Sequence, residues 1–306
     1  MAKQEKVRKT PQIKPPVFSA DVDFKPKKNK GYENRVLLLN PPTDRTQFVG
    51  SDNYFPLGLI MLATVLRENE DVAEVMDINN DFFHRDLSDE LFVQHMNEVV
   101  LPYIEEFKPD IVGIGGTFSG AFKYTKIIGR MVKNKFPDIP TIVGGNHAST
   151  FKGMVLERFR YIDYVMIGEG EYTFPELLYS IVHNDGKGIE LIDGLCYRKG
   201  GHRGTPYDAS LQDDHTPATE IITQEKKFYI NNLDELPRPD FDVVGVDKYY
   251  MDTSNWYNPL NIEVVIHKLK ISCIICMVQI FYFIDHIVCT SISYLWTMHM
   301  PHVTKC

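Results

Sequence analysis

Five short apolar runs alternate with stretches of helical periodicity between residues 35 and 183. The runs, each of the length of a buried strand, lie at 35–40, 72–78, 110–115, 141–145 and 162–168. The stretches that follow them predict helices at 57–69, 88–106, 120–135, 150–158 and 173–183. Buried strands that alternate with amphipathic helices are typical of a parallel sheet covered on both faces. The pattern therefore predicts an α/β fold with a Rossmann-like, doubly wound, five-stranded parallel sheet.

The pattern changes after residue 185. Residues 192–208 predict a small β-hairpin with a turn at Gly200-Gly201, and the proline-punctuated stretch 231–244 predicts a linker. From about residue 262 the chain is an irregular hydrophobic tail without a clear period. We expect four parts: a disordered basic arm, an α/β domain, a hairpin with its linker, and the tail, at 1–33, 34–185, 186–250 and 251–306.

Composition and charge exclude several classes of protein. The net charge of −8 argues against a nucleic-acid partner for the body of the chain. The absence of cysteine from the first 195 residues and of an apolar leader indicates a reducing compartment, and we expect a cytoplasmic protein. The longest charge-free run of the tail, 271–284, has 14 residues and is shorter than the roughly 20 that span a membrane. A membrane association is therefore not expected, and the sequence indicates no oligomeric state.

Candidate chemistry lies in the loops that follow the predicted strands. They read NPPTD, FPLGL, GIGGTFSG, GGNHAS and GEGEYTF, at 40–44, 55–59, 113–120, 144–149 and 168–174. Loops at the carboxyl ends of parallel strands are where an open α/β sheet binds its ligand. Glycines in such loops let the backbone approach that ligand closely. We therefore expect a binding site in this set of loops.

The glycine spacing excludes the two commonest ligands of such a sheet. A dinucleotide site needs G-x-G-x-x-G, but Phe118 stands where the third glycine after Gly113 and Gly115 belongs. No P-loop sequence for a nucleoside triphosphate occurs. A large ligand with a tail between strands remains, and it suits the small and hydroxyl-bearing residues Thr117, Ser119, Gly144, Gly145 and Ser149.

Seven short motifs occur in a recognisable order along residues 35–250. They are NPP, PLGL, PDIVGI, GGNHAS, GEGE, GLCYR and LDELP, which begin at 40, 56, 109, 144, 168, 194 and 233. Each motif is weak alone, but the ordered series resembles the N-terminal cobalamin-binding domain of the cobalamin (B12)-dependent radical S-adenosylmethionine enzymes.

The resemblance implies that a corrin ring lies over the carboxyl edge of the sheet and that its nucleotide tail enters beside 117–119 and 144–149. The cofactor-binding residues that it implies are Pro56, Leu57, Gly58, Thr117, Ser119, Gly144, Gly145, His147, Ser149, Gly168, Glu169 and Gly170. For Glu169 and Glu171 a second interpretation is open, because carboxylates at the start of a helix also cap its backbone amides.

The lower ligand of cobalt is not expected to be a histidine of this chain. Other cobalamin-binding domains supply one from D-x-H-x-x-G, but here Thr46 stands two residues after Asp44. A threonine hydroxyl is a poor ligand for cobalt. His147 is a possible substitute, but a hydrogen bond to backbone or to a ligand amide is the role that we expect for it.

The resemblance also implies a radical domain with a C-x-x-x-C-x-x-C motif for a [4Fe–4S] cluster and S-adenosylmethionine. Cys273 and Cys276 match its last two cysteines as remnant metal ligands, but Leu269 replaces the first. Residues 251–306 are therefore expected to be a truncated, frameshifted or degenerate start of that domain, or a tail that pairs with another protein. A zinc half-site of the two cysteines with His267 or His286 is a further alternative.

Three functions follow from these expectations. The first is a cobalamin-binding module whose cluster and S-adenosylmethionine site are absent and whose ligand is a corrinoid. The second is an active radical methyltransferase-type enzyme that uses a third cluster ligand. The third is a non-catalytic scaffold or membrane-associated interaction protein.

Overall fold

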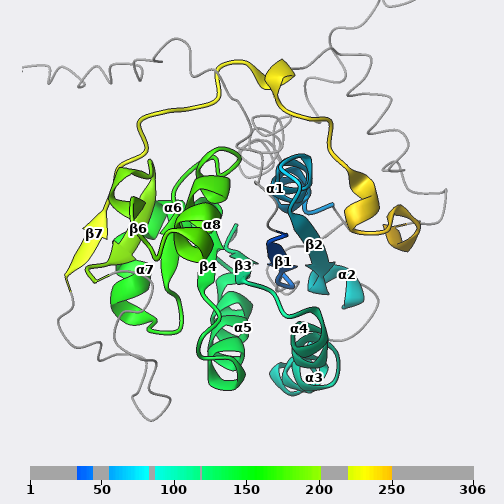
Figure 1. Ribbon diagram of the computed structural model, residues 1–306. Coiled ribbons are helices and arrows are strands. Elements are labelled where there is room, and N and C mark those ends of the chain that lie inside the picture. Colours follow the sequence, from blue (N-terminus) through cyan, green and yellow to red (C-terminus); the bar gives the residue numbers. More distant parts are fainter. Residues whose placement is uncertain (1–32, 44–54, 83–86, 118, 201–219, 250–306) are drawn as a thin grey trace, which may run out of the picture.

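The computed structural model describes residues 33–43, 55–82, 87–117, 119–200 and 220–249. In this part of the chain seven strands form one sheet in the order β2-β1-β3-β4-β5-β6-β7 (Figure 1). The strands are β1 (Arg35–Asn40), β2 (Val72–Asp77), β3 (Ile111–Gly115), β4 (Thr141–Gly144), β5 (Tyr164–Met166), β6 (Leu195–Arg198) and β7 (Ile221–Thr223). The first five are parallel, which confirms the predicted sheet, and β6 and β7 pair antiparallel beyond β5.

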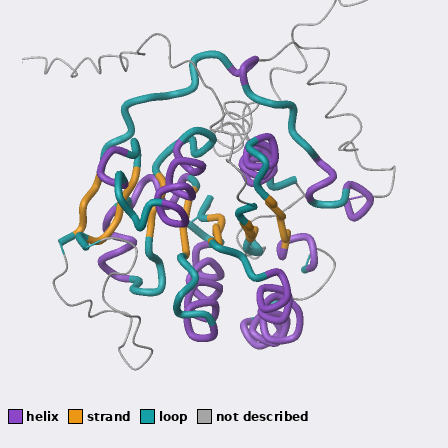
Figure 2. Tube along the Cα trace, in the orientation of Figure 1, coloured by secondary structure: helices purple, strands orange, loops and turns teal. Residues whose placement is uncertain are grey.

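Helices cover both faces of the sheet (Figures 1 and 2). They are α1 (Leu57–Glu68), α2 (Ile78–Asp81), α3 (Asp89–His95), the π-helical η2 (Met96–Val100), α4 (Leu101–Phe107), α5 (Phe122–Lys135), α6 (Asn146–Phe151), α7 (Gly153–Arg158) and α8 (Thr173–His183). Four short 3-10 turns follow at η3 (Ile189–Leu191), η4 (Leu233–Glu235), η5 (Phe241–Val243) and η6 (Val246–Tyr249). The five predicted helices are therefore present, and the one expected at 150–158 is divided into α6 and α7 at Lys152, whose φ is 48°.

Two hydrophobic clusters lie on opposite faces of the sheet because alternate strand residues point to opposite sides. Leu37 and Leu39 of β1 pack with α3, α4 and α5. Val36 and Leu38 pack with α1 and α8. All five residues of β3 are buried, as expected for a central parallel strand. The edge strand β2 instead alternates between partly exposed and buried residues.

The order of the strands creates a topological switch point beside β1. The chain places β2 on one side of β1, then crosses to the other side for β3, β4 and β5. The helices that follow β1 and β3, α1 and α5, therefore lie on opposite faces of the sheet, and sheets of this kind bind ligands where the order of strands reverses. The predicted loops after β3, β4 and β5 all emerge at this carboxyl edge.

The helix predicted at 88–106 is interrupted by a π-turn. It begins as expected at Ser88, whose Oγ accepts a hydrogen bond from the N–H of Leu91 at 3.2 Å. Pro102, in the first turn of α4, lacks the N–H that would bond to the carbonyl of residue 98. The preceding turn is widened, with the N–H of Leu101 bonded to the oxygen of Met96. The π-turn thus accommodates a proline inside a continuous helical rod.

The predicted hairpin at 192–208 has its first strand in β6, and its residues 201–208 lie outside the described part of the chain. The chain does turn at Gly200, whose φ is 109°. The strand that pairs with β6 on its outer side, however, is β7, and Tyr197 lies opposite Ile222. Both strands extend the main sheet rather than forming a separate unit, because Val165 of β5 pairs with Cys196. Among the described residues no helix is both long and apolar enough to cross a membrane.

Candidate site at the carboxyl edge of the sheet

The loops after β3 and β4 meet through two glycines. The N–H of Gly116 donates to the oxygen of Gly144 at 2.6 Å, and the N–H of His147 donates to the oxygen of Gly116 at 3.0 Å. A Cβ on Gly145, whose φ is 103°, would lie 2.9 Å from the carbonyl carbon of Gly116. A Cβ on Gly116 would lie 2.9 Å from the oxygen of Gly144. Glycine is therefore required at 116 and 145 by close backbone approach.

Gly144 and Gly58 are glycines for another reason. Neither has a positive φ, and a Cβ built on either would have no atom of the described residues within 4 Å. Gly144 ends β4 and Gly58 is the second residue of α1, so both lie at the carboxyl edge. Neither their conformation nor the packing of the residues that the structure describes requires a glycine at these positions. Both leave an open surface at the edge where a ligand is expected.

His147 is held by its neighbours. Its Nδ1 lies 2.9 Å from Ser119 Oγ, which joins α6 to the loop after β3. Its ring is clamped between the rings of Phe122 and Phe151, with centroid distances of 3.9 and 4.4 Å. Partial burial, and less strongly the charge of Lys126, lower its pKa, so the imidazole is neutral at neutral pH. The ring is thus fixed, with Nε2 as its remaining polar atom.

The loop after β5 is tied to this cluster and to α1. The N–H of Gly168 donates to Ser149 Oγ at 2.9 Å. A Cβ on Gly170 would lie 3.1 Å from Leu62 Cδ2, so this loop packs against α1. Hydrogen bonds thus join the loops after β3, β4 and β5, which carry Thr117, Ser119, Gly144, Gly145, His147, Ser149, Gly168, Glu169 and Gly170. Pro56, Leu57 and Gly58 lie at the start of α1, at the same edge of the sheet.

Capping of the helix by Glu169 and Glu171 is wrong. Helix α8 begins at Thr173, and its N-cap, Tyr172, receives no side-chain hydrogen bond. Glu169 turns away from the helix because its Oε2 accepts a hydrogen bond from the N–H of Ile230 at 2.7 Å. The Glu171 carboxylate accepts hydrogen bonds from the N–H groups of Gly170 and Glu171, which precede α8, so these bonds do not cap the first turn of the helix.

Glu171 is buried, with 3% of its surface exposed. Among the residues that the structure describes, its Oε2 has no hydrogen-bond partner. Burial, reinforced by the nearby charge of Glu169, raises the pKa of the Glu171 carboxyl to about 7. The last residue of the loop at 168–171 therefore carries a buried carboxyl group whose pKa lies near neutral pH.

A second polar cluster lies at the ends of β1 and β2. Asn40 Nδ2 donates to Asp77 Oδ1 at 2.7 Å, and Asp77 also accepts from the N–H of Asn80 at 3.3 Å. The hydroxyl of Tyr249 donates to the other carboxylate oxygen. Burial raises the pKa of Asp77 against these donors, which lower it. The cluster joins the ends of β1 and β2 to each other and to Tyr249.

Several predicted residues lie outside the described part of the chain: residues 1–32 of the basic arm, Thr46, Leu269, Cys273 and Cys276. Within the described residues, no group of three His, Cys, Asp or Glu side chains is placed to hold a metal ion. Sequence reasoning missed Asp77 and Lys226. Asp77 could have been found as the polar residue that ends an alternating strand. Nothing in the sequence around Lys226 distinguishes it from a surface lysine.

An open α/β sheet with a glycine-lined edge at its switch point defines a ligand-binding domain of the doubly wound class. Residues 50–178 match the sequence model of the B12 binding domain. The chain thus contains a cobalamin-type binding domain, related to those of B12-dependent radical S-adenosylmethionine methyltransferases.

Two curated relatives illustrate this relationship. The uncharacterized methyltransferase PH0819 of Pyrococcus horikoshii is 27% identical over 245 residues, which cover 79% of this chain and 45% of the relative. The cobalamin-dependent radical SAM methyltransferase TokK of Streptomyces tokunonensis is 25% identical over 158 residues, 51% of this chain and 21% of TokK. The chain thus spans less than half the length of these relatives. The solved structure of the cobalamin-dependent enzyme OxsB aligns with 71% of this chain and 25% of that chain, at 18% identity and a TM-score of 0.48.

Proposed function

We propose that this chain binds cobalamin at the carboxyl edge of its sheet. The corrin ring is placed beside the start of α1 and the loop at 168–171, and the nucleotide tail lies against 117–119 and 144–149. When bound, cobalamin supplies a cobalt centre that can carry a methyl group. The residues of this chain bind and orient the corrinoid, and they exclude water from the face that rests on the loops.

One observation carries this proposal: Gly144 is open, whereas its neighbour Gly145 is crowded. Gly145 is needed by the chain itself. Gly144 has no such reason, and a side chain there would project into the space above β4 where the tail is placed. Gly58 repeats the same feature at the start of α1. Two unexplained glycines that flank the switch point fit a large, flat ligand lying close to backbone.

The test is the binding of hydroxocobalamin by the purified full chain. After free corrinoid is removed, the protein fraction should keep corrinoid absorbance at about one equivalent per chain. Gly144→Val should fold normally but bind about tenfold more weakly or worse, because a steric clash costs on the order of 1–3 kcal/mol.

Asp138→Ala is the matched control, since Asp138 is exposed in the loop before β4, at the other end of the same strand. It should bind as the wild type does. A wild-type fraction without corrinoid absorbance, or a Gly144→Val variant that binds normally, would overturn the proposal.

We further propose that the chain acts as a binding module and does not complete methyl transfer by itself. In the C-x-x-x-C-x-x-C cluster motif, Leu269 stands at the position of the first cysteine, before Cys273 and Cys276. Iron and sulfide analysis after anaerobic reconstitution tests this point. Much less than one iron per chain is expected, and about four irons would establish a complete cluster and with it the second function, a radical enzyme.

A further inference from the structure

The segment 224–230, called the strap here, follows β7 and is fastened to the site. Beyond it the chain crosses the whole width of the sheet, from β7 at one edge to β2 at the other (Figure 2). The far end is anchored on α1, where the N–H of Asp240 donates to Thr64 Oγ1 at 2.9 Å. What concerns the site is the near end, which lies against the loop at 168–171.

Lys226 of the strap is a buried lysine, with 5% of its side chain exposed. Its stem passes between two glycines of left-handed conformation. A Cβ on Gly168 would lie 3.3 Å from Lys226 Cγ, and a Cβ on Gly194 would lie 2.8 Å from Lys226 Cδ. The glycines of the GEGE and GLCYR motifs thus leave a passage that this one side chain fills.

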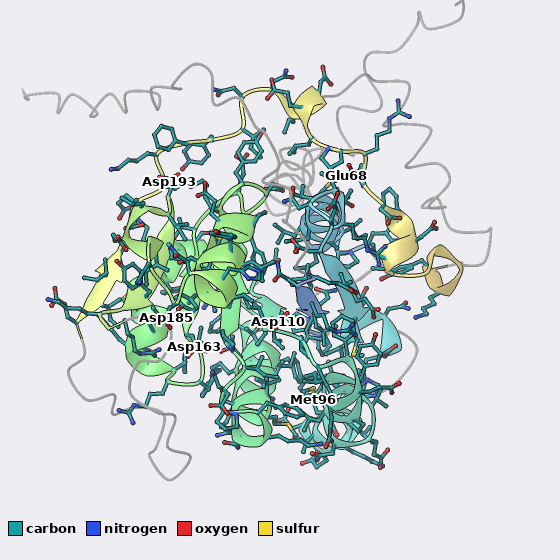
Figure 3. The ribbon with its side chains drawn as sticks, viewed as in Figure 1. Glu68, Met96, Asp110, Asp163, Asp185 and Asp193 are labelled. Atoms are coloured by element: carbon teal, nitrogen blue, oxygen red, sulfur yellow. The ribbon has the colours of Figure 1, made fainter. Side chains whose placement is uncertain are left out.

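The ammonium group of Lys226 is bonded to the loop. Its Nζ donates to the backbone oxygen of Glu169 at 2.9 Å and lies 3.6 Å from Asp193 Oδ2. Asp193, labelled in Figure 3, also accepts from the N–H groups of Lys227 and Phe228, at 2.9 and 3.0 Å. The strap is therefore held to Glu169 through Lys226, and to Asp193 through the backbone of the two residues that follow.

The loop and the strap also bind each other in the reverse direction, because Glu169 Oε2 accepts from the N–H of Ile230. The charge balance here depends on the lysine. Glu169, Glu171 and Asp193 surround it, and its own pKa is lowered by burial against the pull of these carboxylates. Without its charge, buried acids would face one another with less compensation.

We propose that Lys226 is the positioning residue of the loop at 168–171, so that the strap fixes the surface on which the corrinoid rests. This inference rests on the proposed function. Lys226 acts through Glu169 and Gly168 and does not itself contact the corrinoid. Corrinoid binding and the fastening of the strap are then coupled, and each stabilises the other.

The test compares amide hydrogen exchange in the full chain without corrinoid. Lys226→Met keeps an unbranched stem between the glycines but loses the charge. The exchange rate in the peptides that cover 166–172 and 226–231 should rise about tenfold, because one charge-assisted hydrogen bond is lost. The exchange rates in β1 and β3 should not change. Lys226→Arg should recover most of the protection. A purely stabilising role would instead raise exchange throughout the sheet.

Lys152→Met is the matched control. It removes the exposed ion pair between Lys152 and Glu225 of the same strap but leaves the loop untouched. It should exchange as the wild type does. Unchanged exchange in Lys226→Met, or a uniform rise across the sheet, would overturn the positioning role.

A second arm measures hydroxocobalamin affinity. Lys226→Met should bind about tenfold more weakly, and Lys152→Met normally, if the loop that the lysine holds is the corrinoid surface. Equal affinity of Lys226→Met and the wild type would overturn the link to the corrinoid. A wild type that binds none would refute the proposed function, and the exchange measurement would still decide whether Lys226 positions the loop.

Discussion

Tyr249 donates a hydrogen bond to Asp77, the last residue of β2, although 172 positions separate them. The ring of Tyr249 also contacts Phe55, at a centroid distance of 4.3 Å, just before the start of α1. One residue of the linker therefore holds two loops of the carboxyl edge in place.

Tyr249→Phe should lower the free energy of unfolding by about 1–2 kcal/mol at pH 7, because Asp77 stays buried with one donor fewer. Urea denaturation of the full chain measures the loss. Tyr229→Phe, at an exposed position of the strap, is the control and should change nothing. Equal stability of the two variants would show that the bond to Asp77 contributes no net stability.

Gly144, the last residue of β4, and Gly145, which follows it, should respond to substitution in opposite ways. Gly145→Ala should destabilise the fold by about 2–4 kcal/mol, because it combines a left-handed φ with a backbone clash. Gly144→Ala should leave stability unchanged or raise it by up to about 1 kcal/mol. Thermal unfolding of both variants checks the pair. Similar losses at the two positions would contradict the distinction between structural and ligand-facing glycine.

Glu171→Gln should remove a pH dependence of stability. The pKa of Glu171 is raised to about 7 in the folded chain, so folding favours its protonated form. Its contribution to stability is complete below its unfolded pKa of about 4.5 and is lost as the pH rises through about 7. Between pH 6 and pH 8 the wild type should lose on the order of 1 kcal/mol relative to the variant.

The measurement is urea denaturation of both proteins across that range. The glutamine keeps the shape of the side chain but does not titrate. A difference between the two proteins that stays constant with pH would refute the shifted titration of Glu171.

His147 should contribute to corrinoid affinity without binding cobalt. The ring is fixed by Ser119 and two phenylalanines, so His147→Ala should weaken hydroxocobalamin binding by about tenfold, through lost packing and a lost hydrogen bond. The electron paramagnetic resonance spectrum of the bound cob(II)alamin should show no nitrogen splitting from the protein. Such a splitting in the wild type that disappears in His147→Ala would instead establish a histidine ligand.

The sequence was informative where burial leaves a local pattern. Residues 36–39 and 111–115 carry no polar side chain because their strands are covered on both faces, and the positions of these strands were predicted to within a residue. The open or crowded state of a loop glycine could not be predicted, since Gly144 and Gly145 are neighbours with identical side chains.

Pairings across long separations were missed for a physical reason. The hairpin was predicted from a local turn at Gly200, but the partner strand follows 19 residues that are outside the described part of the chain. Lys226 looks like an ordinary surface lysine in the sequence. Its burial arises only when the turns at Gly168 and Gly194 come together to form its passage.

The crossing from β7 to β2 also determines at which edge of the sheet Tyr249 lies. The polypeptide enters the sheet at Arg35, at the amino edge, and after Tyr249 it continues from the carboxyl edge beside Asp77. Tyr249, the last residue that the structure describes, therefore lies at the edge where the ligand is placed and not at the far side of the sheet. A segment attached closely to Tyr249 would have a high effective concentration at this edge, so that even a weakly interacting segment would often meet the exposed face of a bound corrinoid.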